Sequence, residues 1–341
     1  MARNYLITGG AGFIGSNYVH RLVERGEKVT IYDNLSRAGA KVNLAWLEKT
    51  FGKDGFELVV GDVTDASLLE STARNADVIV HLAGQVAVTT SVTDPRHDFE
   101  SNALGTFNAL EAARLSGHKP LFIYASTNKV YGGMEDVRIV EDATRWHYAD
   151  LALGCPETQP LDFHSPYGCS KGTGDQYVRD YARIYGLSTV VMRQSCIYGP
   201  RQFGVEDQGW LAWMIIAAVT GRPITIYGDG KQVRDVLNVD DLLNAYDAAI
   251  SKMDAARAQV YNLGGGTQNV LAVWSEFGPL LEKLLGRKIP VARADWRPGD
   301  QRVFYADFSK AKRELGWEPQ IGLEEGIEKL FNWVQDNKSL F

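Results

Sequence analysis

The segment TGGAGFIG, close to the start of the 341-residue chain, constrains the fold more than any other feature. It places Gly9, Gly12 and Gly15 directly after the apolar run NYLIT and before a stretch with helical spacing that extends through Arg25. Glycines let the backbone turn sharply and approach a pyrophosphate, and a helix that begins there offers free N–H groups and a positive dipole end. The segment therefore predicts a dinucleotide site at a strand-to-helix turn, with a glycine-rich turn that binds nothing as the alternative.

Asp33 supports the first interpretation because it ends the next apolar run, KVTIYD. A carboxylate at that position accepts hydrogen bonds from both hydroxyls of a ribose. It would repel a 2′-phosphate, so the sequence favours NAD as the cofactor. Arg37 is close enough in the sequence to keep NADP as a minority alternative.

Short apolar runs alternate with helical stretches over the first part of the chain, and this order is typical of βαβ units around a parallel sheet. The expected fold is α/β, a Rossmann-type doubly wound parallel sheet with a smaller, mostly C-terminal α/β substrate domain. We expect the first domain over residues 1–198, with an inserted segment at 132–165, and the second over 199–341. A strand and helix near 224–252 are candidates to return to the first domain.

The second half has a less regular order of elements. Helical patterns cover residues 207–219, 240–252, 269–285 and 323–335. The runs PITIYG, VYNLG and KIPVA between them predict short strands.

Composition excludes several classes of protein. The chain is 45% hydrophobic and 23% charged with a net charge of −6, so a general nucleic-acid surface is not expected. Cys155, Cys169 and Cys196 have no metal-ligand spacing, and we expect neither a disulfide nor a metal site. We find no signal peptide and no apolar run of membrane-spanning length, which makes the cytoplasm the expected location and a membrane partner unexpected.

Further candidate cofactor contacts lie where later strands end, the edge at which open α/β sheets bind ligands. The pair Asp62 and Val63 is a candidate for the adenine, the HLAG segment for the dinucleotide backbone, and Asn102 for bracing a neighbouring loop. Each of these has a purely structural role as its alternative. The full set of additional cofactor candidates is Phe13, Ile14, Asn34, Ser36, Asp62, Val63, Leu82, Ala83, Gly84, Gln85, Asn102, Ser126 and Cys196.

Candidate catalytic residues follow in the same order along the chain. SPYGCSK places Tyr167 and Lys171 four residues apart, on one face of a helix that Pro166 can begin, and Thr127 stands at the end of an earlier strand. A free tyrosine ionises near pH ~10, but a nearby ammonium and a positively charged nicotinamide both favour the phenolate. Tyr167 is thus the expected general base, Thr127 holds the reacting oxygen, and Lys171 also bridges the nicotinamide ribose.

TGGAGFIG, STNKVYG, SPYGCSK and IYGPRQ, in this order, resemble the extended short-chain dehydrogenase/reductase superfamily, specifically its nucleotide-sugar epimerases and dehydratases. The resemblance runs over essentially the whole chain. Finer segments such as HLAGQVAVTTS and LDFHSPYGCSKG resemble the 2-epimerases of CDP-linked dideoxyhexoses. This resemblance implies bound NAD⁺, a CDP-sugar substrate, a homodimer or homotetramer, and the catalytic roles of Thr127, Tyr167 and Lys171. It also implies oxidation at C2, turning of the 2-keto sugar, and return of the hydride to the opposite face.

Two positions depart from patterns common in that superfamily. Sugar-nucleotide dehydratases need an acid and a base beside the tyrosine, usually an Asp-Glu pair just after the threonine, whereas this chain has Asn128 and Lys129. The difference favours epimerisation over elimination. Cys196 stands where many members have asparagine, so only a backbone contact to the cofactor is expected from it.

The diphosphate of a sugar nucleotide calls for arginine or lysine in charge-assisted contact. Arg234 is the first candidate and Arg297, with Asp300, the second, and solvated surface arginines are the alternative interpretation. No residue distinguishes cytosine from uracil. The weaker candidates for substrate contact, beside Thr127, are Asn128, His164, Gln202, Gln208 and Tyr227.

Three other functions remain open at this stage. A UDP-hexose 4-epimerase would use the same tyrosine, lysine and NAD on a different carbon. A reductase would release its cofactor in each cycle. A non-catalytic NAD-binding scaffold is the third, because a fold alone does not fix a function.

Overall fold

The structure is a computed structural model that describes residues 2–297 and 300–341. Its backbone divides into two compact units, each built from separate stretches of the chain. Unit 1 contains the residues up to 130 together with 165–193 and 246–261. Unit 2 contains residues 131–164, 194–245 and 262–341.

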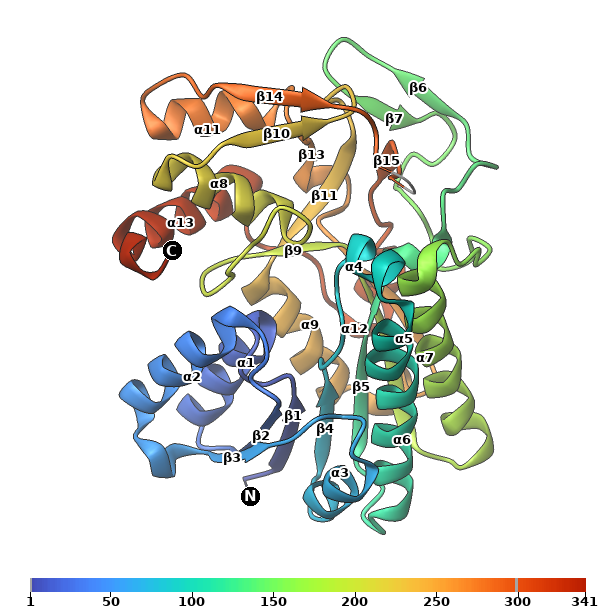
Figure 1. Ribbon diagram of the computed structural model, residues 1–341. Helices are drawn as coiled ribbons and strands as arrows, with labels where there is room; N and C mark the ends of the chain where they lie inside the picture. The colour runs from blue at the N-terminus through green and yellow to red at the C-terminus, as the bar shows by residue number, and fades with distance from the viewer. Residues whose placement is uncertain (1, 298–299) are drawn as a thin grey trace. The chain divides into compact units, whose positions relative to one another are not determined.

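Unit 1 is organised around a seven-stranded sheet with the order β12-β8-β5-β4-β1-β2-β3. Figure 1 labels the strands β5, β4, β1, β2 and β3 of this sheet. The strand pairs β1·β2, β1·β4, β2·β3 and β4·β5 are parallel. The order reverses between β1 and β4, so the fold is the expected doubly wound α/β sheet with its switch point at the end of β1. The strands are β1 (Asn4–Thr8), β2 (Lys28–Asp33), β3 (Glu57–Val60), β4 (Val78–His81), β5 (Leu121–Thr127), β8 (Ser188–Gln194) and β12 (Val260–Leu263).

Helices connect these strands. α3 packs on α6 and α6 on α7, whereas α1 packs on α2. Leu6 and Ile79 of the sheet belong to one buried apolar cluster with Leu110 of α6 and Val178 of α7. The helices are α1 (Phe13–Glu24), α2 (Ala38–Phe51), α3 (Ala66–Ala73), α4 (Val88–Thr93), α5 (Pro95–Phe99), α6 (Gly105–Leu115), α7 (Ser165–Ile184) and α10 (Met253–Ala256), and the last part of α9 (Val239–Ser251), from Tyr246 onward, also groups with unit 1. None of the helices in the described stretches is both long and apolar enough to cross a membrane.

The described residues of unit 2 form three small sheets. In the first, β11 pairs in parallel with β9 and β15 and antiparallel with β13, and the other two are the pairs β10·β14 and β6·β7. α8 and α13 contribute much of the apolar cluster, with Ile215 and Leu330 both fully buried. The strands are β6 (Ile139–Glu141), β7 (Trp146–Tyr148), β9 (Cys196–Tyr198), β10 (Ile224–Tyr227), β11 (Val233–Asn238), β13 (Val270–Ala272), β14 (Val291–Ala294) and β15 (Val303–Phe304). The helices are α8 (Trp210–Thr220), α11 (Phe277–Leu285), α12 (Ser309–Leu315) and α13 (Leu323–Asp336).

The prediction of a helix over residues 269–285 is wrong for the first half of that range. The chain forms a 3₁₀ turn over Gly266–Asn269 and then strand β13, and α11 begins only at Phe277. The reason is pairing, since Val270 and Leu271 lie opposite Asp235 and Arg234 in the antiparallel register with β11. Strand formation with a buried neighbour outweighs the local helical spacing.

The two units divide the chain differently from the expected boundary at residue 198. The stretch expected as an insertion into the first domain groups with unit 2, where Tyr148 donates a hydrogen bond to the Val303 carbonyl (3.0 Å) and the Cys155 amide donates to the Tyr305 carbonyl (2.8 Å). Of the segment near 224–252, only the part after Tyr246 groups with unit 1. The strand that joins the large sheet late in the chain is β12.

Candidate functional site

The glycine-rich turn of unit 1 is closely packed at the end of β1. Gly9 has a φ of +69°, which favours glycine, and a Cβ there would lie 2.8 Å from the Ala83 amide nitrogen. A Cβ on Gly15 would collide with the Gly9 carbonyl oxygen. Gly12 caps the N-terminus of α1, whose first turn has neither an acidic side chain nor a side-chain cap among the described residues. The first N–H groups of α1 are thus left for an anionic ligand, and the turn fits a pyrophosphate.

Asp33 ends β2 beside this turn. Its Oδ2 accepts a hydrogen bond from the Ala11 amide (3.0 Å) and its Oδ1 from the Leu35 amide (2.8 Å). Burial raises the pKa of the Asp33 carboxyl, and these two amides and the charge of Arg37 oppose the rise. The carboxylate therefore fixes the glycine turn, and it stands at the position from which a ribose would be bound.

Asp62, in the loop after β3, organises the adjacent segment. Its Oδ2 accepts from the Asn34 amide (2.7 Å), and its Oδ1 accepts from the amide and the hydroxyl of Thr64 (3.0 and 2.8 Å). Burial raises the pKa of this carboxyl, but the donors prevail and hold it below its ordinary value. The predicted adenine contact at Asp62 thus has a defined structural role of its own.

The HLAG segment approaches Asn102, which lies in a π-helical turn over Glu100–Leu104. A Cβ on Gly84 would collide with the Asn102 Oδ1, and the Asn102 amide donates to the Gln85 carbonyl (3.0 Å). Short π-helical turns inside α-helices often mark functional sites. The side-chain oxygens of Gln85 and Asn102 are buried without a hydrogen-bond partner in the described part of the chain. Such oxygens are ready acceptors for a bound polar group.

The predicted catalytic residues come together in unit 1. Tyr167 and Lys171 occupy the first two turns of α7 and are 9% and 7% exposed. The Thr127 hydroxyl, at the end of β5, donates to Asn128 Oδ1 (3.4 Å) and accepts from the Lys129 amide (3.2 Å), and it lowers the pKa of the Tyr167 phenol. Ser165 begins α7 with a φ of +65° and caps it by accepting from the Gly168 amide (3.2 Å). This start of the helix fixes the orientation of Tyr167.

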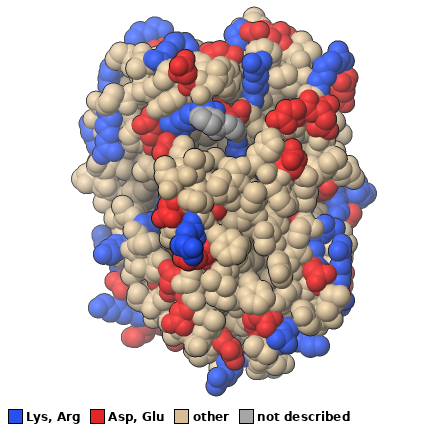
Figure 2. All heavy atoms as spheres, turned by 45° about the vertical axis from the view of Figure 1, so that its right-hand side comes forward, with Lys and Arg blue, Asp and Glu red and all other residues tan. Residues whose placement is uncertain are grey.

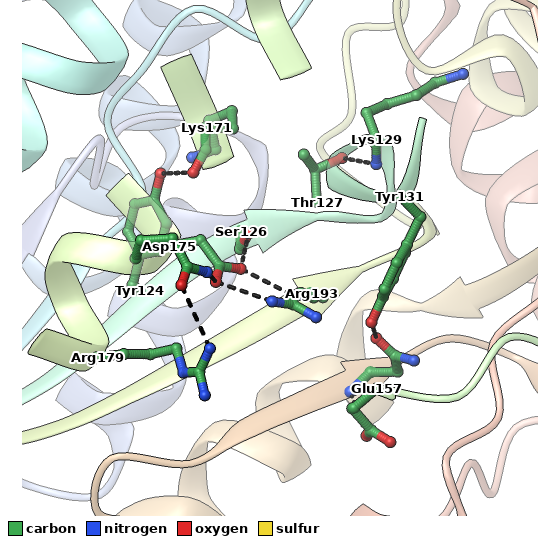
Figure 3. A network of polar contacts seen from close by, with 12 residues as sticks. Tyr124, Ser126, Thr127, Lys129, Tyr131, Glu157, Lys171, Asp175, Arg179 and Arg193 are labelled. Atoms are coloured by element: carbon green, nitrogen blue, oxygen red, sulfur yellow. Dashed lines mark hydrogen bonds and ion pairs between the residues drawn. The ribbon is translucent and has the colours of Figure 1, made fainter. Parts of the chain in front are cut away.

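Burial shifts both ionisable members of this cluster toward their neutral forms. It raises the pKa of Tyr167 to about 12, with Thr127 opposing the rise, and lowers the pKa of Lys171 to about 8. The Lys171 ammonium lies 4.4 Å from the centroid of the Tyr124 ring, and Tyr124 donates its hydroxyl to the Lys171 carbonyl (3.2 Å). Figure 3 shows Lys171 above this ring. Without a bound positive charge, Tyr167 is a phenol near neutrality.

Behind this cluster lies a buried ion pair that the sequence reasoning missed. The Asp175 carboxylate binds the Arg193 guanidinium at two points (2.8 and 3.0 Å) and accepts the Ser126 hydroxyl (2.9 Å), an arrangement that Figure 3 shows. Ser126 was expected at the cofactor, and in the structure its hydroxyl is used here. The signal in the sequence was the spacing of Lys171 and Asp175, four residues apart on one helix face.

His81 and Asp98 are two further buried polar residues that the sequence did not single out. His81 binds the Thr8 hydroxyl through Nδ1 (2.8 Å) and the Thr106 hydroxyl through Nε2 (3.2 Å), and burial lowers its pKa to about 3. His81 is therefore neutral. Asp98, in α5, is completely buried.

Arg234 and Asp300 in unit 2, both predicted substrate contacts, lie together. Arg234 Nη2 donates to Asp300 Oδ1 (2.6 Å) and Nη1 to the Val233 carbonyl (2.7 Å). Arg234 is 7% exposed, so the interpretation as a solvated surface arginine does not apply to it.

Arg297 and Tyr227 form the second pair. The Arg297 guanidinium lies 3.8 Å from the centroid of the Tyr227 ring and within 3.1 Å of the Asp207 carboxylate and 3.6 Å of the Glu206 carboxylate. Tyr227 donates its hydroxyl to Glu206 Oε1 (2.9 Å). Both carboxylates are exposed, so a competing anion can replace them.

The weaker candidates in unit 2 are spread over three places. Gln202 is buried and donates to the Ile197 carbonyl (3.2 Å), and Gln208 forms a bridge with Val205. Cys196 accepts a hydrogen bond from Trp210 Nε1 at its sulfur (3.4 Å). His164 is exposed and lies 3.0 Å from the Asp162 carboxylate.

The remaining candidates of unit 1 are placed around the same turn and strand ends. Val63 and Asn128 are buried, Asn34 and Ser36 are exposed, and the others are half-buried. The half-buried ones are Phe13, Ile14, Leu82, Ala83, Gly84 and Gln85.

A glycine-rich turn with an acidic partner at the next strand and a buried Thr-Tyr-Lys cluster define a class of Rossmann-type proteins with a dinucleotide site next to a proton-transfer group. Comparison with known proteins agrees. Residues 6–330 match the family described as GDP-mannose 4,6 dehydratase, and the chain belongs to that family.

Several members of known activity resemble the chain along nearly its whole length. CDP-paratose 2-epimerase of Salmonella typhi is 43% identical over 336 residues, which is 96% of this chain and 98% of that protein. The crystal structure of dTDP-glucose 4,6-dehydratase from Streptomyces venezuelae with NAD bound has a TM-score of 0.85 at 29% identity and covers 99% of this chain and 98% of its own. UDP-glucose 4-epimerase from Thermus thermophilus, in complex with NAD, has a TM-score of 0.81 at 31% identity, with 98% and 99% covered.

Proposed function

We propose that the protein is an NAD-dependent epimerase that inverts C2 of a CDP-linked dideoxyhexose, interconverting CDP-paratose and CDP-tyvelose. The observation that carries the proposal is the buried cluster of Thr127, Tyr167 and Lys171 in unit 1. Similarity to a CDP-paratose 2-epimerase, at 43% identity, supports the choice of substrate.

NAD fits the first part of the site. The N-terminus of α1, which has no side-chain cap, would bind the pyrophosphate, and Asp33 would bind the adenosine ribose. The same carboxylate would repel a 2′-phosphate, which supports NAD over NADP. When bound, NAD supplies an acceptor and then a donor of hydride at the sugar carbon, together with a positive charge in its oxidised form.

Tyr167 would accept and return the proton of the sugar C2 hydroxyl, and its neighbours would assist. In the first half-reaction the Tyr167 phenolate takes the proton of the C2 hydroxyl as the C2–H bond breaks, and in the second the phenol returns it. A phenol whose pKa is about 12 in this site needs additional positive charge to ionise near neutrality. The oxidised nicotinamide would supply that charge. Thr127 would hold the sugar oxygen against Tyr167.

The 3₁₀ turn after β5 favours epimerisation over loss of water. Its first two residues are Asn128 and Lys129, and the Lys129 amide donates to Thr127 (3.2 Å). Figure 3 shows the Lys129 side chain extending away from Thr127. No carboxyl group at this turn is available to donate a proton to a leaving hydroxyl, a role that elimination requires.

Unit 2 would bind the nucleotide end of the substrate. Arg234 and Arg297 offer planar guanidinium groups for the diphosphate, and Tyr227 offers an aromatic face beside Arg297. In this proposal the diphosphate takes the place of Glu206 and Asp207 at Arg297, and Asp300 orients Arg234.

We also propose a homodimer or homotetramer. Phe107 of α6, Tyr177 of α7 and Tyr185, directly after α7, are 39%, 46% and 46% exposed. Their rings form a continuous row through Tyr181, with centroid distances of 6.0, 6.4 and 4.8 Å. Figure 2, in which this side comes forward, shows a broad area of uncharged residues. Exposed aromatic areas of this kind are typical of surfaces between protein chains.

We place the enzyme in the cytoplasm. None of the three cysteines, all of which lie in described residues, forms a disulfide, and Cys169 is exposed. An exposed thiol is compatible with a reducing compartment.

The test is nuclear magnetic resonance of the purified protein with CDP-paratose or CDP-tyvelose in deuterated water, without added NAD. We expect interconversion with no solvent deuterium at C2, because the hydrogen returns as hydride from the retained cofactor. Deuterium at C2 would indicate proton abstraction and overturn the mechanism. Turnover of UDP-glucose with no turnover of CDP-sugars would instead identify a UDP-hexose 4-epimerase.

A further inference from the structure

Asp98 is a completely buried carboxylate that the mechanism above does not use. It lies in α5, where its Oδ1 accepts a hydrogen bond from the Asn102 amide (3.0 Å). Its Oδ2 is buried with no hydrogen-bond partner among residues 2–297 and 300–341, and Asp98 takes part in none of the salt bridges found there. Burial raises the pKa of this carboxyl, and the Ser170 hydroxyl, the Asn102 amide and the charges of Lys171 and His97 oppose the rise. A buried carboxylate is costly unless another charge compensates it.

Hydrogen bonds connect Asp98 to the first turns of α7. The Asn102 amide also lies 3.2 Å from the Ser170 hydroxyl, and that hydroxyl donates to the Tyr167 carbonyl (3.2 Å). Ser170 directly precedes Lys171 in the sequence. The Asp98 carboxylate is thus held against the stretch of helix that carries both proposed proton-transfer residues.

In the described part of the chain, two carboxylates, a neutral imidazole and an aromatic ring act on the Lys171 ammonium. Burial lowers its pKa, and Asp98 is the stronger of two carboxylates that oppose this, the other being Asp175. Asp175 already binds Arg193 at two points, so its charge is largely compensated. His81 is neutral, and Tyr124 offers only the face of its ring. Asp98 therefore remains as the carboxylate that the Lys171 ammonium can balance.

Three groups other than NAD act on the Tyr167 phenol. Asp98 raises its pKa further after burial, whereas the hydrogen bond from Thr127 and the charge of Arg37 lower it. One carboxylate therefore acts on both members of the pair, and it opposes loss of the proton from each.

We propose that Asp98 is a positioning residue that acts as the counter-charge of Lys171, keeping the lysine protonated and setting the pH range in which the Tyr167–Lys171 pair works. The expected effect on the pH range of activity rests on the proposed function. The expected effect on the pKa values of Tyr167 and Lys171 does not. Removing one negative charge lowers the pKa of every neighbouring acid, so Tyr167 and Lys171 must shift in the same direction.

The variant that tests this is Asp98→Asn, which keeps the shape of the side chain and an oxygen for the Asn102 amide. The first measurement follows phenolate absorbance against pH and subtracts the same titration of Tyr167→Phe, or of Asp98→Asn/Tyr167→Phe for the variant. We expect the Tyr167 midpoint to move down by about one pH unit. The second measurement is the pH profile of kcat/KM with the CDP-sugar, whose acid and alkaline limbs should both move to lower pH.

Asp94→Asn is the matched control, because Asp94 is an exposed carboxylate that caps the same helix by accepting from the His97 amide (3.1 Å). It should leave both limbs and the phenolate midpoint in place. Should Asp98→Asn fail to fold, Asp98→Ser removes the same charge with a smaller side chain and serves the same two measurements.

The outcomes separate the two proposals. A phenolate midpoint that moves down in a protein with no activity on CDP-sugars supports the role of Asp98 and contradicts the proposed function. If the Asp98→Asn protein is active at a lower rate but its pH profile of kcat/KM and its phenolate midpoint are unchanged, the proposed role of Asp98 is overturned. Asp98 would then contribute only to packing.

Discussion

The proton-transfer cluster of unit 1 and the arginine pairs of unit 2 differ in how their charges are satisfied. In unit 1 the ammonium of Lys171 is buried over an aromatic ring, and burial shifts its pKa to about 8. In unit 2 the guanidinium of Arg297 already binds two exposed carboxylates, and Arg234 binds Asp300. In the proton-transfer cluster of unit 1, burial shifts the pKa values of the ionisable groups. In unit 2, the arginines are paired with carboxylates of the same unit.

The difference separates chemistry from recognition. A buried group with a shifted pKa can exchange a proton at modest cost, which suits catalysis. An arginine that is paired with carboxylates can exchange one anion for another without exposing its charge, which suits the binding of a diphosphate. Substitutions in unit 1 should therefore change the rate of the reaction, and those in unit 2 should change affinity and stability.

The largest expected effect comes from Tyr167→Phe. It removes the general base and leaves the packing of the ring, so kcat should fall by about 10²–10⁴-fold. Bound NAD and the melting temperature should stay close to those of the unmodified protein, as measured by cofactor absorbance after denaturation and by calorimetry. A near-normal rate would show that another group takes the proton.

Asp33→Ala tests the cofactor half of unit 1. Both carboxylate oxygens accept backbone amides, so the change loosens the glycine turn and removes the ribose contact together. We expect the dissociation constant of NAD to rise by at least about tenfold, the equivalent of one charge-assisted hydrogen bond. Titration calorimetry measures it, with Asp33→Asn as the control that keeps the shape. Equal cofactor occupancy in both variants and the unmodified protein would assign the ribose to another residue.

Comparing Arg234→Ala with Arg297→Ala sharpens the account of unit 2. Arg234 is buried, and its loss leaves Asp300 and a carbonyl unpaired, so the free energy of unfolding should fall by about 3 kcal/mol. Arg297 faces exposed carboxylates, and its loss should change stability by less than about 1 kcal/mol while KM rises. Chemical denaturation and steady-state kinetics of the two proteins would distinguish these outcomes. A stability loss at Arg297 as large as that at Arg234 would contradict the contrast.

An effect confined to a narrow pH range concerns Asp235, a buried carboxylate of β11 whose pKa burial raises to about 6. Because a raised pKa means that the folded state binds the proton more tightly, the contribution of Asp235 to stability falls as pH rises from about 4 to about 6 and is constant above that. Asp235→Asn should remove this part of the pH dependence, which denaturation midpoints across that range would reveal. The amide can still accept from Gly266 and Ala306, which share Oδ2 in the unmodified protein. Parallel midpoint curves for both proteins would refute the assignment.

Unit 1 was the more predictable half because its function is encoded in short, local patterns. The glycine turn, Asp33 and the Tyr167–Lys171 spacing each depend on neighbours within one strand or one helical turn. The doubly wound sheet followed from the alternation of elements, as confirmed by the strand order.

The residues that were missed depend on contacts distant in sequence. Asp98 meets α7 through Asn102 and Ser170, and Arg193 meets Asp175 across 18 positions. The strand β13 exists because Val270 finds β11 as a partner, which the local helical spacing does not reveal. Such pairings are set by tertiary packing, and a single sequence carries no direct record of them.

The late arrival of β12 in the large sheet has a consequence for how the protein is made. This edge strand, Val260–Leu263, is synthesised after two of the three stretches of unit 2, yet it lies beside β8 in the large sheet. During translation, the six earlier strands of the large sheet are therefore made before β12, and β8 lacks its edge partner until β12 has been synthesised. Open sheet edges pair readily with other chains, and long-range pairings form slowly. The nascent protein thus passes through a stage in which the edge of β8 is available for pairing with other chains.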